Sequence, residues 1–378
     1  MSKFEEQTSG YVKLRRGLPN LNKKLAGKAP IAVAFLGGSI TEGYGASEPD
    51  KTSWRALTEH FLKECFSAAG ATCINAGVGG TNSTFGAFRL KEHVLHRGEI
   101  DLLFVEFSVN DGRDREESIR GMEGIVRQCR RLSPDADICF VYTAAEKNLS
   151  AEMPFNIAVH EEVADRYDLP SVNLAARIYA QIEAGQARWE ELAPDLVHPN
   201  DVGYALYAQD VREFLNTALM GDVPSIDGSS NMDLPSPLDD RNYEHGVMLN
   251  VREAAASHVG FTIEETVPEP LINWRYGAEH LCTDSELALL SFTVSGKSAG
   301  LLLFCGPDSG IFEYSLDGLT FHQVNLFDDW CVGAFRPVIA MFSLAGDQQI
   351  SHITVRNTGL KDERSTGTGL RVLRVFSG

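Results

Sequence analysis

Short apolar runs and longer segments of helical period alternate along residues 31–220. The runs lack polar alternation, which is typical of strands buried on both faces of a parallel sheet. They lie at 31–36, 72–76, 102–107, 138–143 and 171–174. This alternation predicts an α/β fold, a three-layer α/β/α sandwich with a mostly parallel five-stranded sheet. Active sites of such folds lie beyond the carboxyl ends of the strands.

The segments between these runs carry apolar residues at the spacing of one helix face. In residues 52–66, for example, Trp54, Leu57, Phe61 and Leu62 share a face. The same spacing predicts further helices near 85–97, 116–132, 155–168 and 202–219.

The pattern changes after residue 220. Residues 221–244 are rich in Gly, Pro, Ser, Asp and Asn and keep no apolar period, so we interpret them as a linker or surface strap. Residues 245–378 hold short strand-like runs separated by turn signals, which predicts an accessory β-sandwich of jelly-roll type. Within it, Asp317-Gly318 predicts a hairpin. Residues 1–30 are treated as an N-terminal extension.

The net charge of −18 disfavours two classes of partner. Nucleic-acid binding needs a basic surface, and adhesion to anionic membranes needs basic clusters. We therefore expect neither a nucleic acid nor a membrane as partner. The sequence leaves a homo-oligomer open.

The seven cysteines are odd in number, and several stand inside apolar runs, so we expect buried, reduced thiols. The first residues lack the apolar core of a secretory signal. Together these features predict a cytoplasmic protein. The cysteine and histidine spacing suggests no zinc site, and we expect neither a metal nor a cofactor.

Four fragments with candidate chemistry stand at predicted strand ends or before a predicted helix. They are "GGSITEG" with Ser39, "INAGVGGTNS" with Gly80, "FVEFSVND" with Asn110, and "APDLVHPN" with Asp195 and His198. The carboxyl ends of parallel strands share one edge of a sheet, so the fragments can gather there.

This set, in this order, resembles the SGNH hydrolases, also called the GDSL esterase/lipase family. The resemblance covers about half the chain, residues 31–220, and implies a flavodoxin-like catalytic domain. Carried over to this sequence, it implies Ser39 as nucleophile and Asp195 and His198 as its partners. Gly38 stands where the family often has aspartate, and Ser108 where it has glycine. The "GGSIT" variant is more similar to a carbohydrate-esterase branch than to the lipases.

The residue types suit acyl transfer. A serine hydroxyl needs an adjacent base, an imidazole serves near neutral pH, and a carboxylate fixes its tautomer. The tetrahedral oxyanion needs preorganised donors, which the amides of Ser39 and Gly80 and the side chain of Asn110 would supply. The sequence does not separate Gly80 from Gly79 as donor.

Each feature also has a purely structural interpretation. Ser39 alone would be a turn or cap residue, and Asp111 could cap the following helix. His93 and His96 have i, i+3 spacing, but without a third ligand we expect surface residues. Trp189, Trp274 and Trp330 could be carbohydrate platforms, although core or interface packing is the default.

The sequence therefore predicts a serine esterase that removes small acyl groups, above all acetyl, from carbohydrates. A lipase, thioesterase or acyltransferase on the same machinery is the enzymatic alternative, because fold does not settle function. A glycan-binding protein with a degenerate site is the non-enzymatic alternative.

Overall fold

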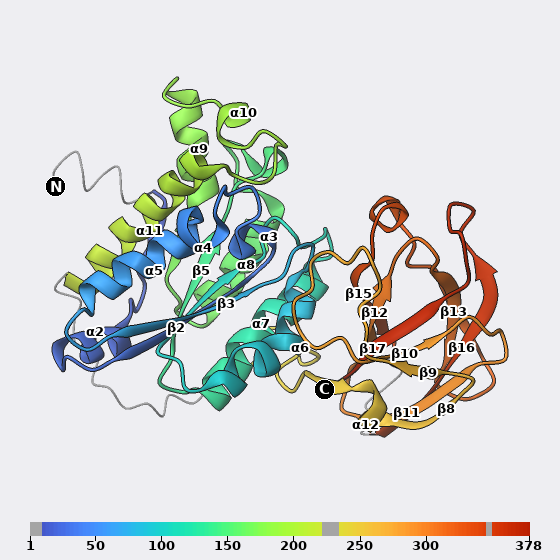
Figure 1. Cartoon of the computed structure of the whole chain (residues 1–378). Helices are drawn as coiled ribbons and strands as arrows, with labels where there is room; N and C mark the ends of the chain where they lie inside the picture. The colour runs from blue at the N-terminus through green and yellow to red at the C-terminus, as the bar shows by residue number, and fades with distance from the viewer. Residues whose placement is uncertain (1–9, 221–233, 345–349) are drawn as a thin grey trace. The chain divides into compact units, whose positions relative to one another are not determined.

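The computed structural model describes residues 10–220, 234–344 and 350–378. The chain divides into two compact units, Met1–Glu244 and His245–Gly378. Figure 1 shows a mixed helix-and-strand unit followed by an all-β unit.

The first unit is built on a six-stranded sheet of order β1-β6-β5-β4-β2-β3. Its strands are β1 (Val12–Lys13), β2 (Ile31–Gly37), β3 (Ala71–Gly77), β4 (Leu102–Glu106), β5 (Asp137–Tyr142) and β6 (Ser171–Asn173). Strands β2 to β6 pair in parallel, and β2, β4 and β5 are almost fully buried, whereas the edge strand β3 is mostly only partly buried. The mostly parallel sheet is therefore confirmed, with one strand more than the five predicted. The extra strand, β1, pairs antiparallel with β6 at the edge.

Helices cover both faces of this sheet (Figure 1), which confirms the three-layer prediction. One group comprises α2 (Pro19–Ala26), α5 (Trp54–Cys65) and α11 (Asp201–Met220), and the other α6 (Ser83–His93), α7 (Arg115–Leu132) and α8 (Phe155–Arg166). Short helices α3 (Ser39–Glu42), α4 (Pro49–Thr52) and α10 (Trp189–Leu192) and the longer α9 (Leu174–Glu183) complete the unit. The sequence pattern had indicated neither α2 nor α9.

The segment interpreted as a linker lies partly outside the described residues, since residues 221–233 are not among them. Its remainder, 234–244, packs on α7. Glu244 accepts a hydrogen bond from Arg127 at 2.6 Å, and the buried Glu123 accepts from the amides of Leu238 and Asp239. This part is thus held to the first unit by charge-assisted hydrogen bonds. Part of the N-terminal segment, residues 12–13 and 19–26, likewise contributes β1 and α2 to the first unit.

The second unit consists of two antiparallel sheets. One has the order β15-β12-β17-β10-β9, with β7 also paired to β17, and the other β14-β13-β16-β11-β8. The strands of the first are β7 (Val247–Asn250), β9 (Thr262–Glu264), β10 (His280–Thr283), β12 (Ala299–Cys305), β15 (Arg336–Phe342) and β17 (Leu370–Ser377). Those of the second are β8 (Ala255–Val259), β11 (Leu289–Ser295), β13 (Gly310–Ser315), β14 (His322–Val324) and β16 (Ile350–Lys361). The short helix α12 (Val251–Ala254) joins β7 to β8.

The two sheets share one apolar core. Leu301 of β12 and Val372 of β17 lie in the same buried cluster as Phe292 of β11 and Val355 of β16. Tyr314 of β13 and Phe342 of β15 stack with ring centroids 4.1 Å apart. Alternating inward side chains explain this packing, and the predicted β-sandwich is confirmed. The predicted hairpin joins β13 to β14.

Among the described residues, no helix is long and apolar enough to cross a bilayer. The cysteines are free thiols, of which Cys129, Cys139, Cys305 and Cys331 are buried. Cys65, Cys73 and Cys282 are only partly buried, so the expectation of burial is wrong for these three.

Candidate active site

All five predicted site residues stand at the carboxyl edge of the first sheet or in the loop before α11. Ser39 follows β2, Gly80 follows β3, and Asn110 follows β4, while Asp195 and His198 precede α11. The topology accounts for this gathering, because β2 lies between β3 and β4.

The serine turn requires its two glycines. A Cβ on Gly37 would lie 2.2 Å from Thr41 Oγ1, and one on Gly38 would lie 2.4 Å from Asn110 Oδ1. Such separations are far inside van der Waals contact, so neither position accommodates a side chain on this backbone. Gly38 thus allows the Asn110 side chain to lie against the residue before Ser39. A side chain at position 38 would require Asn110 to move.

Ser39, His198 and Asp195 form one chain of hydrogen bonds. Ser39 Oγ lies 2.8 Å from His198 Nε2, and His198 Nδ1 lies 2.6 Å from Asp195 Oδ2. Because a carboxylate only accepts, Nδ1 carries the proton and Nε2 of the neutral ring is free to accept from Ser39. The histidine is therefore oriented as a general base toward the serine.

The loop that holds Asp195 is itself fixed. Asp195 Oδ1 accepts hydrogen bonds from the amides of Val197 and His198. Partial burial alone would raise the pKa of Asp195, but hydrogen bonds from the His198 amide and ring and the Val197 amide lower it below 3.8. The carboxylate is thus stabilised in its ionised form, which is the form that can accept from an imidazole N–H.

Leu196, between Asp195 and His198, adopts a positive φ of 65°, which is uncommon for a residue with a side chain. Its carbonyl accepts from Trp189 Nε1 at 3.0 Å and from the Glu146 amide at 2.9 Å. These bonds hold the turn in a conformation that brings the Asp195 carboxylate back onto the histidine ring. Trp189 is buried and acts here as an anchor rather than a sugar platform.

The glycine-rich turn after β3 contains two candidate oxyanion donors, the amides of Gly79 and Gly80, which differ in their surroundings. The Gly79 amide donates to Glu42 Oε2 at 2.7 Å, whereas Gly80 is exposed and has a positive φ of 70°. The Gly79 amide is therefore already engaged. Arg89 ties this turn to the serine turn, because its guanidinium donates to Gly37 O at 2.8 Å and to Ala76 O.

A buried carboxylate beneath the serine turn was missed by the sequence argument. Glu106, at the end of β4, accepts from Thr41 Oγ1 at 2.9 Å and Thr143 Oγ1 at 2.8 Å, and also from the Gly38 amide. Burial raises the pKa of Glu106, and these three donors oppose that shift. Since Gly38 precedes Ser39, Glu106 fixes the orientation of the peptide that leads into the nucleophile turn. Its one sequence signal is a charge inside the apolar run "LLFVEF".

A second missed element joins the serine loop to the histidine loop. Tyr204 donates its hydroxyl to the carbonyls of Ile40 at 3.3 Å and Tyr44 at 2.5 Å. Asp201 accepts from the Ser47 amide at 2.8 Å and from Thr52 Oγ1 at 2.7 Å. The serine loop and α4 are thus tied to the first turn of α11, directly after His198, which preorganises the Ser39–His198 contact.

Residues 35–206 match a family model described as the GDSL-like lipase/acylhydrolase family. This part of the chain is therefore similar to that family. The match spans the serine loop, the glycine-rich turn, Asn110 and the Asp195–His198 loop.

Two solved structures resemble this chain over nearly its whole length. Both are of a two-domain esterase active on acetylated mannans, one of them co-crystallised with mannopentaose. The complex covers 97% of this chain and 98% of its own at 24% identity and a TM-score of 0.80. The other covers 98% of both chains at 24% identity and a TM-score of 0.83. Both units of the fold are therefore shared. No curated protein matches the sequence.

The first unit also contains a second histidine–aspartate pair, which the sequence did not reveal. His160 Nε2 of α8 lies 2.8 Å from Asp111 Oδ2, which also accepts from Ser83 Oγ at 2.7 Å. The Ser83 amide donates to Asp111 Oδ1, so Asp111 caps α6. The expectation that it caps the following helix is wrong, because Asp114 accepts from the Glu117 amide at the start of α7.

The described residues contain no group of three or more His, Cys, Asp and Glu side chains able to hold a metal ion. His93 is buried in α6 and His96 is exposed, so the surface expectation is wrong for His93, which faces the interior of the helical layer.

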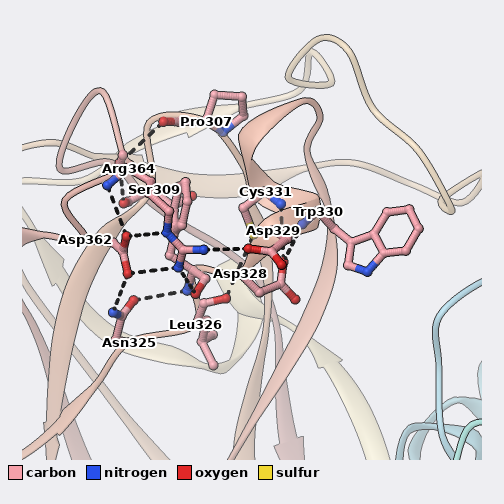
Figure 2. Close-up of polar contacts among 12 residues, drawn as sticks. Pro307, Ser309, Asn325, Leu326, Asp328, Asp329, Trp330, Cys331, Asp362 and Arg364 are labelled. Carbon is pink, nitrogen blue, oxygen red and sulfur yellow. Dashed lines mark hydrogen bonds and ion pairs between the residues drawn. The ribbon is translucent and has the colours of Figure 1, made fainter.

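In the second unit, Figure 2 shows a polar cluster around Asp362 and Arg364. Asp362 accepts from Asn325 Nδ2 at 3.1 Å, and Arg364 donates to Asp362 and Asp329. Because these charges bind one another, the cluster is a structural clamp of the surrounding loops. Trp330 points away from it and is 70% exposed, so the expectation of core packing is wrong for this residue, and packing in an interface stays a prediction.

Proposed function

We propose that the protein is a serine esterase that hydrolyses acetyl esters of carbohydrates, with Ser39 as nucleophile, His198 as base and Asp195 as its orienting acid. The observation that carries this proposal is the continuous hydrogen-bond chain from Ser39 Oγ through His198 to Asp195, at 2.8 and 2.6 Å. A nucleophile in contact with a base that is itself oriented by a third group is the geometry that acyl transfer needs.

The reaction follows from this geometry. His198 Nε2 takes the Ser39 proton as Oγ attacks the ester carbonyl, and the imidazolium that forms is stabilised by Asp195. The same proton then passes to the departing sugar oxygen as its bond to the acyl carbon breaks. A water, deprotonated by His198, attacks the acyl-serine and releases acetate, which restores Ser39.

The oxyanion of both tetrahedral intermediates needs donors next to Ser39. We assign them to the amides of Ser39 and Gly80 and to the side-chain amide of Asn110. The Asn110 side chain lies beside Gly38, the residue before Ser39, and this position supports the third donor. Engagement of the Gly79 amide by Glu42 favours Gly80 over Gly79.

The carbohydrate assignment is supported by the two-unit architecture. A fold that matches an esterase active on acetylated mannans over both units is the expected setting for a sugar-ester substrate. Acetylated mannan fragments are therefore the first substrates to test, followed by acetylated xylan fragments.

The test measures acetate release from acetylated manno- and xylo-oligosaccharides by the full chain, with Ser39→Ala as control. Wild-type protein is expected to release acetate, and Ser39→Ala is expected to release none. Hydrolysis of p-nitrophenyl esters should fall sharply beyond four acyl carbons. Sustained activity on long acyl chains without acetate release from sugars would instead favour the lipase alternative.

Two further predictions, on location and on partners, rest on the sequence. A cytoplasmic location stays a prediction. Action on a small-molecule or oligosaccharide ester, without a nucleic-acid or membrane partner, also stays a prediction. A fractionation experiment with an antibody to the chain tests the location.

A further inference from the structure

An exposed aromatic ring lies directly beside the proposed base. The Tyr44 ring centroid is 4.5 Å from that of His198, with the two planes at 62°, and Tyr44 is 60% exposed. A single exposed aromatic residue needs no explanation by itself. The position of Tyr44 does need an explanation, because its ring lies against the histidine that transfers the proton in the proposed reaction.

The ring stands on a loop whose backbone is fixed. The Tyr44 amide donates to Ser39 O at 2.9 Å, and the Tyr44 carbonyl accepts from Tyr204 at 2.5 Å. Gly45, with a φ of +91°, packs so closely that a Cβ there would lie 2.6 Å from Pro199 O. The backbone beneath the exposed ring is therefore preorganised. A ligand that contacts the ring does not have to order this loop on binding.

The mechanism places the sugar on this side of the site. During acylation the Ser39 Oγ–carbon bond forms, the carbon–sugar oxygen bond breaks, and His198 Nε2 gives its proton to that oxygen. The leaving oxygen must therefore be within hydrogen-bond reach of His198, and the pyranose that carries it must lie beside the imidazole. The carbonyl oxygen of the ester, by contrast, points toward the oxyanion donors.

We propose that Tyr44 is a substrate-binding residue that stacks against the apolar C–H face of the pyranose bearing the ester. This inference rests on the proposed function and deepens it. Tyr44 selects the alcohol part of the ester and leaves the choice of acyl group to other residues. An aromatic ring offers a large rigid contact with few rotamers to immobilise, which suits a sugar face.

The experiment compares Tyr44→Leu and Tyr44→Phe on two substrates, an acetylated manno-oligosaccharide and ethyl acetate. The ethyl leaving group offers no ring face to stack. Acid release is followed at constant pH. Tyr44→Leu should raise KM for the oligosaccharide about 10-fold, with kcat within about 3-fold, and should change ethyl acetate hydrolysis far less. Tyr44→Phe, which keeps the ring, should behave as wild type on both substrates.

An equal loss on both substrates would overturn the inference, because Tyr44 would then act through His198 rather than through the sugar. No loss on either substrate would also overturn it. So would a change in preference among acetate, propionate and butyrate esters, which would place the ring on the acyl side. If wild-type protein hydrolyses ethyl acetate but no sugar ester, the proposed function itself fails, and the sugar contact fails with it.

Discussion

Two histidine–aspartate pairs of similar length lie in the same unit. His198 and Asp195 are 2.6 Å apart, and His160 and Asp111 are 2.8 Å apart. Each pair also has a serine within hydrogen-bond distance, Ser39 on the histidine in the first and Ser83 on the aspartate in the second. Pair length therefore does not distinguish a catalytic pair from a structural one.

The two pairs differ in the partner of the second histidine nitrogen and in the exposure of the side chains. The side chains of His198 and Asp195 are 18% and 50% exposed, and the free nitrogen of His198 faces a serine hydroxyl. The side chains of His160 and Asp111 are 0% and 2% exposed, and His160 Nδ1 meets no hydrogen-bond partner among the described residues. A general base must have access to the group from which it takes a proton. Of the two histidines, only His198 meets this requirement.

The sharpest way to break this comparison is to remove each serine. Ser39→Ala should lower kcat/KM for p-nitrophenyl acetate by about 10⁴-fold or more, because the nucleophile is lost. Ser83→Ala should stay within about 10-fold of wild-type kcat/KM and instead lower the free energy of unfolding by about 1–3 kcal/mol, because Asp111 loses a buried donor. Steady-state kinetics and urea unfolding measure the two effects. Loss of activity in Ser83→Ala at unchanged stability would contradict the assignment.

The two aspartates form the next matched pair. Asp195→Asn should lower kcat by about 10²–10⁴-fold, since an amide no longer holds the histidine tautomer or stabilises imidazolium. Asp111→Asn should mainly reduce the melting temperature, because its amide group would meet the donors of Ser83 and His160. If both variants lost activity in proportion to stability, Asp195 would be no more than structural.

A pair of asparagines tests the proposed oxyanion donor. Asn110→Ala should lower kcat by about 10²–10³-fold with little change in KM, as expected for a donor used in the transition state. Asn156 donates to the carbonyls of Ser108 and Asp111 and supports the same segment from α8. Asn156→Ala should therefore reduce stability and cost less than about 10-fold in kcat. Equal losses of kcat would show that only the shape of the segment matters.

The smallest effect concerns pH. Burial alone would raise the pKa of Asp195, but hydrogen bonds from His198 and Val197 lower it below 3.8. The carboxylate therefore stays ionised above that pH. Asp195 should then add no proton uptake to the acidic limb of kcat/KM between pH 4 and pH 7, and the slope of that limb should not exceed one. A pH–rate profile measures the slope. A slope of two would mean that Asp195 also takes up a proton in this range.

Much of the fold follows from local pattern. Strands β2, β4 and β5 are nearly continuous apolar runs because both of their faces are covered by helices, and this burial leaves a sequence signature. Strand β1 has only two residues and pairs at an edge, so it shows no period. The capped helix α9 begins directly after β6 and was not separated from that strand.

The residues of the candidate site could be named because four short fragments, at strand ends or before a helix, resemble in their order those of a known family. Their supports could not, because these are pairs distant in sequence. Glu106 contacts Thr41 and Thr143, and Tyr204 contacts the carbonyl of Tyr44, only once the sheet has brought their loops together. Tyr44 itself carries no local signal, since its position beside His198 depends on the packing of two loops.

The most direct test of the central claim is to identify the serine that is acylated or phosphorylated by a substrate-like reagent. Diethyl p-nitrophenyl phosphate reacts with serines that are activated by a base. Trypsin places Ser39 in residues 29–51 and Ser83 in residues 64–89, so peptide mass spectrometry separates them. We predict one diethylphosphoryl group on Ser39 and none on the Ser39→Ala variant. A label on Ser83, or a label that persists in Ser39→Ala, would contradict the account.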